Sequence, residues 1–513
     1  MQVEIKYSEY QKEFFKQVGS LFNYENKNKY ILVNAVAGSG KTFSLIKSLD
    51  YIPKGKAIKF FAFNKSIASE LKEKLPLTID TSTIHSFGMT SIAGYIQRRA
   101  KLKVEELKSW SFIENYMTEI GRQWENNNQK FTYIFDMIKL INMWRVNLCD
   151  FDTLTTDEEK VRYLMSRYDV YPDGTYATNF IHIWNKIKKY NEKGLEGKLQ
   201  NFKIDYVDMI YLPVQFPQIR VKQFDLVYVD ECQDLSKCQL AFVERSIKTT
   251  GYGVYVGDSN QNIYSFAGAD EQSYNTLKTR EKTLELPLSV SYRCGQSIVE
   301  MAKMINPQIE PNPGNHLGNV IRKGGDVMTA QEGDFVLCRN LKPLITLWFH
   351  FIGRGDKCYI RGKDLSKNLL NLVSKVKHLP VEKGLESMME DLYVLETALI
   401  NQGEPNPKKN KRYTTLLEET SSIIAISKHF SHMKDVLDIL DKIFTDDPVN
   451  GIQLMTIHKS KGLENDRVFI VRRDLIPSKY ALQDYQLQQE QNLLYVAITR
   501  AKRELIFDTQ WKE

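Results

Sequence analysis

An apolar strand pattern near the start of the chain runs directly into a turn of small residues. Residues 30–33 are followed by Ala-Val-Ala-Gly-Ser-Gly-Lys-Thr at positions 35–42, where a helical pattern begins. Backbone N–H groups in such a turn can surround phosphate oxygens, and the positive end of the following helix also favours an anion. Ala35 stands where the usual pattern of this loop has its first glycine. The strand, turn and helix together predict a nucleotide phosphate loop; the alternative is a glycine-rich turn that binds nothing.

A second strand pattern ends in two acidic residues that complement this loop. Residues 224–229 are followed by Asp230 and Glu231. Asp230 suits Mg²⁺, because hard cations prefer carboxylate oxygens, and Glu231 suits a general base or a group that orients water. We expect Lys41 to reach the β- and γ-phosphates and the Thr42 hydroxyl to bind Mg²⁺. These segments predict a nucleoside triphosphatase; the alternative for the acidic pair is a strand end capped by solvated carboxylates.

Length and composition are those of an ordinary globular protein with two to four domains. The chain has 513 residues, of which 42% are hydrophobic and 26% charged. A balance of 70 basic and 63 acidic residues gives a net charge of +7, which is compatible with a polyanionic partner without indicating one. No apolar run reaches the ~18 residues that span a bilayer, and the start lacks signal-peptide character. We therefore expect no membrane contact. The expected location is the cytoplasm or the nucleoid, or the host-cell cytoplasm if the protein is viral.

Strand and helix patterns alternate in two blocks, which predicts an α/β fold with parallel sheets. The first domain is predicted at residues 1–88 and 203–282, with a mostly helical insertion at 89–202. The second domain is predicted at 283–360 and 451–513, with a reduced helical insertion at 361–450. Further candidate strands are residues 58–63, 253–256, 335–338 and 468–471.

The first insertion carries a basic cluster. Glu105 and Glu106 interrupt this cluster, so a solvated helix face is favoured over a contact with nucleic-acid phosphates. The basic residues are Arg98, Arg99, Lys101, Lys103 and Lys108.

Four further segments follow in a fixed order along the chain. They are VGDSNQNIYSF at 256–266, LSVSYR at 288–293, MTIHKSKGLE at 455–464 and LYVAITRA at 494–501. With the phosphate loop and the Asp-Glu segment, they resemble the motifs of the UvrD/Rep family of superfamily 1 DNA helicases. The DYVD sequence at 205–208 also resembles the family segment at which the chain returns to the first sheet domain.

The resemblance implies two RecA-like P-loop NTPase domains with parallel sheets, each with a mostly helical insertion. It implies an ATP-dependent DNA helicase that uses ATP and Mg²⁺, moves 3′ to 5′ on single-stranded DNA and unwinds duplex DNA. The expected partners are single-stranded DNA, junctions of single and double strands, and replication or repair proteins, with a monomer able to act. The alternatives are a DNA-stimulated translocase that displaces bound proteins with little unwinding, and a nucleotide-gated DNA-binding switch.

The resemblance also assigns nucleotide contacts. Gln11 would read the adenine edge, although a solvated helix glutamine is the alternative. Tyr292 would stack on the adenine, Glu464 would contact the ribose or the phosphates, and Gln261 would sense the γ-phosphate. The loop residues of this set are Ala37, Gly38, Ser39, Gly40, Lys41 and Thr42.

Two arginines complete the predicted catalytic group. Arg293 and Arg500 would reach the γ-phosphate from the second domain, since phosphoryl transfer needs charge neutralisation and a guanidinium group suits phosphate oxygens. The catalytic set is Lys41, Asp230, Glu231, Gln261, Arg293 and Arg500.

The predicted DNA contacts follow from the same motifs. Tyr264 and Phe266 occupy positions at which aromatic side chains stack on successive bases, a mode of binding that tolerates any sequence. Core packing is the alternative for both rings. The other predicted contacts are Phe63, Asn64, His85 and His458.

Overall fold

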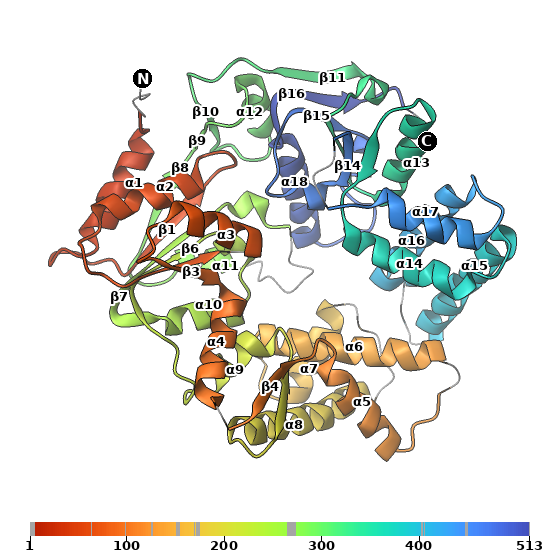
Figure 1. Ribbon diagram of the computed structural model, residues 1–513, viewed down its shortest axis with the longest axis horizontal. Helices are drawn as coiled ribbons and strands as arrows, with labels where there is room; N and C mark the ends of the chain where they lie inside the picture. Colours follow the sequence, from red (N-terminus) through yellow and green to blue (C-terminus); the bar gives the residue numbers. More distant parts are fainter. Residues whose placement is uncertain are drawn as a thin grey trace. The chain divides into compact units, whose positions relative to one another are not determined.

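The computed structural model divides into two compact units (Figure 1). The first unit contains residues 1–35 and 40–288, and the second contains residues 289–513, with the four loop residues Val36–Ser39 grouped with it. The structure describes residues 6–62, 64–97, 99–124, 127–149, 154–168, 170, 175–263, 273–401, 404, 406–446 and 450–511.

The first unit is built on a six-stranded parallel sheet with the order β3-β2-β6-β7-β1-β8. Its strands are β1 Tyr30–Ala35, β2 Ile58–Ala62, β3 Asp80–Thr83, β6 Phe224–Val229, β7 Ile247–Gly257 and β8 Thr283–Leu288. All five residues of β2 are buried, as expected for a parallel strand covered on both faces. Phe60 packs into the core on one face, and Phe61 packs into the core on the other.

Helices cover both faces of this sheet. One core contains side chains from α1 (Glu9–Ser20), α2 (Lys41–Ser48) and α3 (Lys65–Lys74). The opposite core contains side chains from α4 (Ile84–Ile96), α9 (Asp208–Gln215) and α10 (Lys237–Arg245), and it continues into the insertion. The predicted α/β class with parallel sheets is therefore confirmed.

The boundary between the units differs from the predicted position at 283. Residues Thr283–Leu288 form β8, which pairs with β1 along its whole length, so this segment is an edge strand of the first sheet. The first unit ends at Leu288.

The first insertion consists of helices and one small strand pair. Its helices are α5 Lys108–Glu119, α6 Asn127–Val146, α7 Asp157–Arg167 and α8 Tyr176–Leu195. The sequence pattern missed β4 (Lys101–Val104), which pairs in parallel with β5 (Asn201–Ile204). The prediction of a solvated helix face is wrong for the basic cluster: Lys101 and Lys103 lie exposed on β4, and Lys108 is buried. Arg98 lies outside the described residues.

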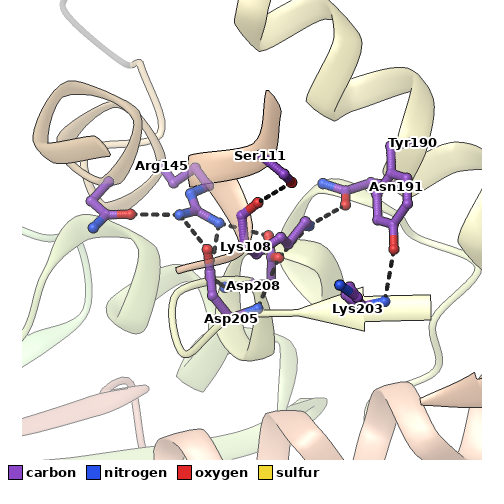
Figure 2. A network of polar contacts seen from close by, with 9 residues as sticks. Lys108, Ser111, Arg145, Tyr190, Asn191, Lys203, Asp205 and Asp208 are labelled. Carbon is purple, nitrogen blue, oxygen red and sulfur yellow. Dashed lines mark hydrogen bonds and ion pairs between the residues drawn. The ribbon is translucent and has the colours of Figure 1, made fainter. Parts of the chain in front are cut away.

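Lys108 belongs to a buried ionic network that joins the insertion to the start of α9 (Figure 2). Its Nζ lies 2.6 Å from Asp208 Oδ2 and donates to Asn191 Oδ1 at 2.6 Å. Arg145 donates to Asp208 Oδ1 at 2.7 Å and to both oxygens of Asp205 at 2.9 and 2.8 Å. Burial alone would lower the pKa of Arg145, but the two carboxylates raise it. The DYVD segment thus supplies the counter-charges for two cations of the insertion.

The second unit has its own six-stranded parallel sheet, with the order β11-β16-β15-β12-β14-β13. Its strands are β11 Asn319–Gly325, β12 Phe335–Cys338, β13 Cys358–Ile360, β14 Ile452–Thr456, β15 Asn465–Ile470 and β16 Ala501–Asp508. The helices beside it are α12 Gln296–Ala302, α13 Leu341–Gly353 and α18 Asp484–Ile498.

The segment between β13 and β14 forms four helices. They are α14 Lys363–Val376, α15 Val381–Asn401, α16 Lys411–Ser427 and α17 Met433–Ile443. In α17 the buried residues Met433, Val436, Leu440 and Ile443 recur at helical spacing and join the core of this unit. Within the described ranges, no helix combines the length and apolarity that a membrane span requires.

Candidate nucleotide-hydrolysis site

The carboxyl ends of three adjacent strands carry the predicted catalytic residues of the first unit. Strands β6, β7 and β1 are neighbours in the sheet, so the loops after them meet at one edge. Gly38 and Gly40 of the loop after β1 have φ of 75° and 74°, a left-handed conformation that glycine adopts without strain. Helix α2 then begins at Lys41, which directs its unpaired backbone N–H groups towards this edge.

The acidic pair after β6, Asp230 and Glu231, makes contacts within the protein and is not freely solvated. Asp230 is 6% exposed, and its Oδ1 accepts the backbone N–H of Glu231 at 2.9 Å. Glu231 has a φ of 53°, which is uncommon for a residue with a side chain and is typical of functional sites. Lys41 Nζ lies 3.7 Å from Glu231 Oε2. The structure thus brings the lysine of the loop to the acidic pair, and the alternative of freely solvated strand-end carboxylates does not hold.

A buried glutamine connects Glu231 with the segment after β7. Gln233 is fully buried, and its Nε2 donates to Glu231 Oε2 at 2.6 Å. Its Oε1 accepts the backbone N–H of Asp258 at 3.1 Å, and Asp258 Oδ2 in turn accepts Gln261 Nε2 at 2.7 Å. Burial raises the pKa of Asp258, although the nearby charge of Lys41 opposes this shift. One series of contacts therefore runs from Lys41 to Gln261.

Three members of this arrangement were not among the predicted site residues: Gln233, Gly257 and Asp258. A Cβ at Gly257 would lie 2.3 Å from Gln233 Oε1 and 2.8 Å from Cys232 Sγ, so only glycine lets the strand pass this close to the glutamine. The signal for them was their place in the predicted motifs, since Gln233 follows Glu231 by two residues and Asp258 precedes Gln261 by three.

Gln11 is buried, not a solvated helix residue. It is 4% exposed on α1, and its Nε2 donates to Ser44 Oγ of α2 at 3.1 Å. A Cβ built on Gly40 would lie 3.8 Å from the same Nε2. Gln11 therefore lies beside the phosphate loop, and its contact with adenine stays a prediction.

In the second unit, the two predicted arginines are held by groups of their own unit. Arg293 Nε forms an ion pair with Glu464 Oε2 at 2.5 Å, and Arg293 Nη1 donates to the carbonyl of Thr499 at 3.3 Å. Arg500 is 1% exposed and donates from Nη1 to the carbonyl of Leu463 at 2.8 Å. Residues from three distant motifs thus gather in one place. Their roles at a γ-phosphate stay predictions.

Tyr292 precedes this arginine cluster in the second unit. Its side chain is 36% exposed, which leaves ring surface accessible. Stacking on adenine stays a prediction for this residue.

The predicted DNA contacts that the structure describes have structural environments of their own. Asn64 is exposed and caps α3 by accepting the backbone N–H of Ile67 at 2.9 Å. His85 lies half-buried in the first turn of α4, and burial lowers its pKa. Burial also lowers the pKa of His458 to about 3, with the charges of Arg339 and Lys459 acting in the same direction. Both histidines are therefore neutral at physiological pH.

Three predicted base contacts lie outside the described residues: Phe63, Tyr264 and Phe266.

The donor set at the strand ends fits Mg²⁺. No group of three or more His, Cys, Asp or Glu within the described ranges could hold a metal ion by itself. Magnesium in nucleotide sites takes one or two protein ligands together with phosphate oxygens and water. The half-buried hydroxyl-bearing Thr42 and the buried carboxylate of Asp230 match that requirement.

Comparison with known proteins identifies the family. The model of the UvrD/REP helicase N-terminal domain matches residues 21–282, and that of the UvrD-like helicase C-terminal domain matches residues 363–510. The chain therefore belongs to the UvrD/Rep helicase family, as the motifs predicted.

Individual relatives are identical to this chain at about a quarter of the aligned positions. It is 26% identical to F-box DNA helicase protein 1 of Schizosaccharomyces pombe, over 94% of this chain and 56% of the relative. It is 24% identical to F-box DNA helicase 1 of Gallus gallus, over 94% and 47%. A probable DNA helicase II homolog of Mycoplasma capricolum is 22% identical, over 94% and 82%. The chain thus spans about half the length of the two F-box relatives.

Proposed function

We propose that this protein is an ATP-dependent DNA helicase that moves 3′ to 5′ along single-stranded DNA and separates the duplex ahead of it. The observation that carries the proposal is the series of contacts from Lys41 through Glu231, Gln233 and Asp258 to Gln261. This series joins the phosphate loop to Gln261, a polar side chain of the segment at 256–266. Family membership and the helicase names of the relatives support the same activity.

The residues at the strand ends of the first sheet divide the hydrolytic chemistry among them. The loop N–H groups and Lys41 bind the phosphates, and Glu231 orients or deprotonates the attacking water. The hydrogen bond from Gln233 fixes one carboxylate oxygen of Glu231 in place. Thr42 and Asp230 would hold Mg²⁺, which neutralises phosphate charge when bound.

Gln261 couples the nucleotide to DNA in this proposal. Its amide nitrogen is held by Asp258, and three residues further along the chain comes Tyr264, the first of the two predicted stacking residues. Presence or loss of a γ-phosphate beside Gln261 would change how strongly the protein binds a base.

Arg293 and Arg500 supply the remaining positive charge. Guanidinium groups aimed at the γ-phosphate stabilise charge that develops in the transition state. Both arginines belong to the second unit, and we propose that ATP hydrolysis requires them. We propose the two sheets as motor domains, with residues 89–202 and 361–450 as their insertions.

The test is strand displacement with Mg²⁺ and ATP on two matched duplexes, one with a 3′ and one with a 5′ single-stranded tail. We expect unwinding of the 3′-tailed duplex alone, and none with Lys41→Ala. Lys47→Ala is the matched control, because Lys47 lies on the same helix, is 39% exposed and pairs with Asp50.

Each other outcome has a defined meaning. Unwinding of the 5′-tailed duplex alone would keep the motor and refute its direction. DNA-stimulated ATP turnover without unwinding would favour the translocase, and nucleotide-dependent DNA binding without turnover would favour the switch.

A further inference from the structure

A cleft of about 930 Å³ lies within the first unit, apart from the nucleotide-site residues. Its walls are the start of β2, the edge strand β3, the outer face of α4 and the segment 218–222, which precedes β6. None of the residues assigned above to the phosphates, the metal or the nucleobase lines it. The cleft therefore needs an account of its own.

Positive charge predominates on the walls. Five cationic side chains line the cleft against the one carboxylate of Asp80. That carboxylate is shared by Lys59 Nζ at 2.7 Å and Lys222 Nζ at 3.2 Å. Arg99 and Arg220 are exposed, and no described carboxylate pairs with either. The cleft thus presents guanidinium groups that are available to an anion.

The cations and the ring in the cleft suit a polymer more than a single small anion. The cationic groups come from β2, α3, the segment after α4 and the segment 218–222, so they are spread along the walls. Tyr95 is half-buried on α4, with the Arg99 guanidinium 5.4 Å from its ring centroid. Guanidinium groups pair with phosphates, and an aromatic ring provides a stacking surface for a base or a sugar.

We propose that this cleft binds the sugar–phosphate backbone of a nucleic-acid strand, with Arg99 and Arg220 on phosphates. The proposal rests on the proposed function, because it adds a second path for the same class of substrate. His85 and Ser86 are consecutive on α4, and Ser86 lines the cleft. A strand held near His85 would therefore have the cleft as its continuation.

The test compares Arg99→Gln/Arg220→Gln with the control Lys16→Gln/Lys54→Gln. Both double variants remove two exposed positive charges, and Lys16 and Lys54 lie outside the cleft. Affinity is measured by fluorescence anisotropy across a salt series, with labelled single-stranded DNA in one arm and blunt duplex in the other. Two lost phosphate contacts lower the slope of log K against log salt by roughly 1.4 on a single strand or 1.8 on a duplex.

A lower salt slope for Arg99→Gln/Arg220→Gln but not for the control variant, on either DNA, supports the inference. The DNA on which the slope falls identifies whether the cleft binds a single strand or a duplex. Equal salt slopes for both double variants and the unaltered protein overturn the inference. An acidic protein segment would then be the expected ligand of the cleft. If the unaltered protein binds no DNA, the proposed function fails as well, so the two failures are distinguishable. Thermal unfolding of each variant verifies that it is folded.

Discussion

The buried network of Figure 2 makes a quantitative prediction about Asp208. This carboxylate is fully buried and lies between Lys108 at 2.6 Å and Arg145 at 2.7 Å. Asp208→Asn keeps the shape of the side chain but leaves two buried cations with fewer counter-charges. Breaking a buried ion pair from one side costs about 3–5 kcal/mol, because an uncompensated charge stays in the interior. We expect a loss of stability of that size in the first unit.

The assay is urea unfolding followed by tryptophan fluorescence. Four of the six tryptophans, at positions 110, 124, 144 and 184, lie in the insertion that the network holds. Hydrogen exchange of peptides from α5, α6 and α9 locates the loss. Glu196→Gln is the control: Glu196 pairs with Lys198 at 2.6 Å on the surface, and such pairs contribute about 0–1 kcal/mol.

The same network predicts an acid response of a definite sign. Burial would raise the pKa of Asp208, but the charges of Lys108 and Arg145 outweigh burial and lower it below 3.8. A carboxyl group with a depressed pKa in the folded state adds stability above its ordinary pKa and loses it as the pH falls below that value. Asp208→Asn should therefore flatten the fall in stability below about pH 4. A loss of stability under about 1 kcal/mol at neutral pH would refute the reasoning.

Two further predictions concern the site residues. Gln233→Leu removes the hydrogen bonds to Glu231 and Asp258. It should lower the kcat of ATP hydrolysis about 10²-fold, measured by steady-state turnover, with little change in nucleotide affinity, measured by titration. Equal losses of kcat and nucleotide affinity would point to a binding role for Gln233. His458, with a pKa of about 3, adds stability that is present above pH 6.5 and lost as the pH falls towards 3. Because His458 stays neutral between about pH 6 and 8, DNA affinity should vary with pH in the same way for His458→Asn and the unaltered protein. A pH dependence that is lost only in the variant would show that this histidine becomes charged.

The sheets could be predicted from sequence because their central strands are continuous apolar runs. Strands β2 and β6 are buried along nearly their whole length, and their patterns identify them. Edge strands carry weaker signals: β8 is largely half-exposed, and β4 is a short segment that contains two exposed lysines. The predicted boundary and the predicted solvated helix face failed at these two places.

The contacts within the site depend on residues that are distant in sequence. Lys108 appeared solvated because Glu105 and Glu106 precede it, yet its partner Asp208 lies 100 residues away. The bond from Asp258 to Gln233 spans 25 residues. Motif spacing places such residues on neighbouring strand ends, but only packing decides which atoms meet.

Single-turnover ATP hydrolysis by Glu231→Gln, at saturating single-stranded DNA, tests the central claim most directly. Glutamine keeps the size of the side chain but cannot accept a proton from water. We expect the hydrolysis rate to fall by about 10²–10⁴-fold with ATP still bound, as for removal of a general base. A rate within about twofold of the unaltered protein would contradict the assignment of the catalytic edge to β1, β6 and β7.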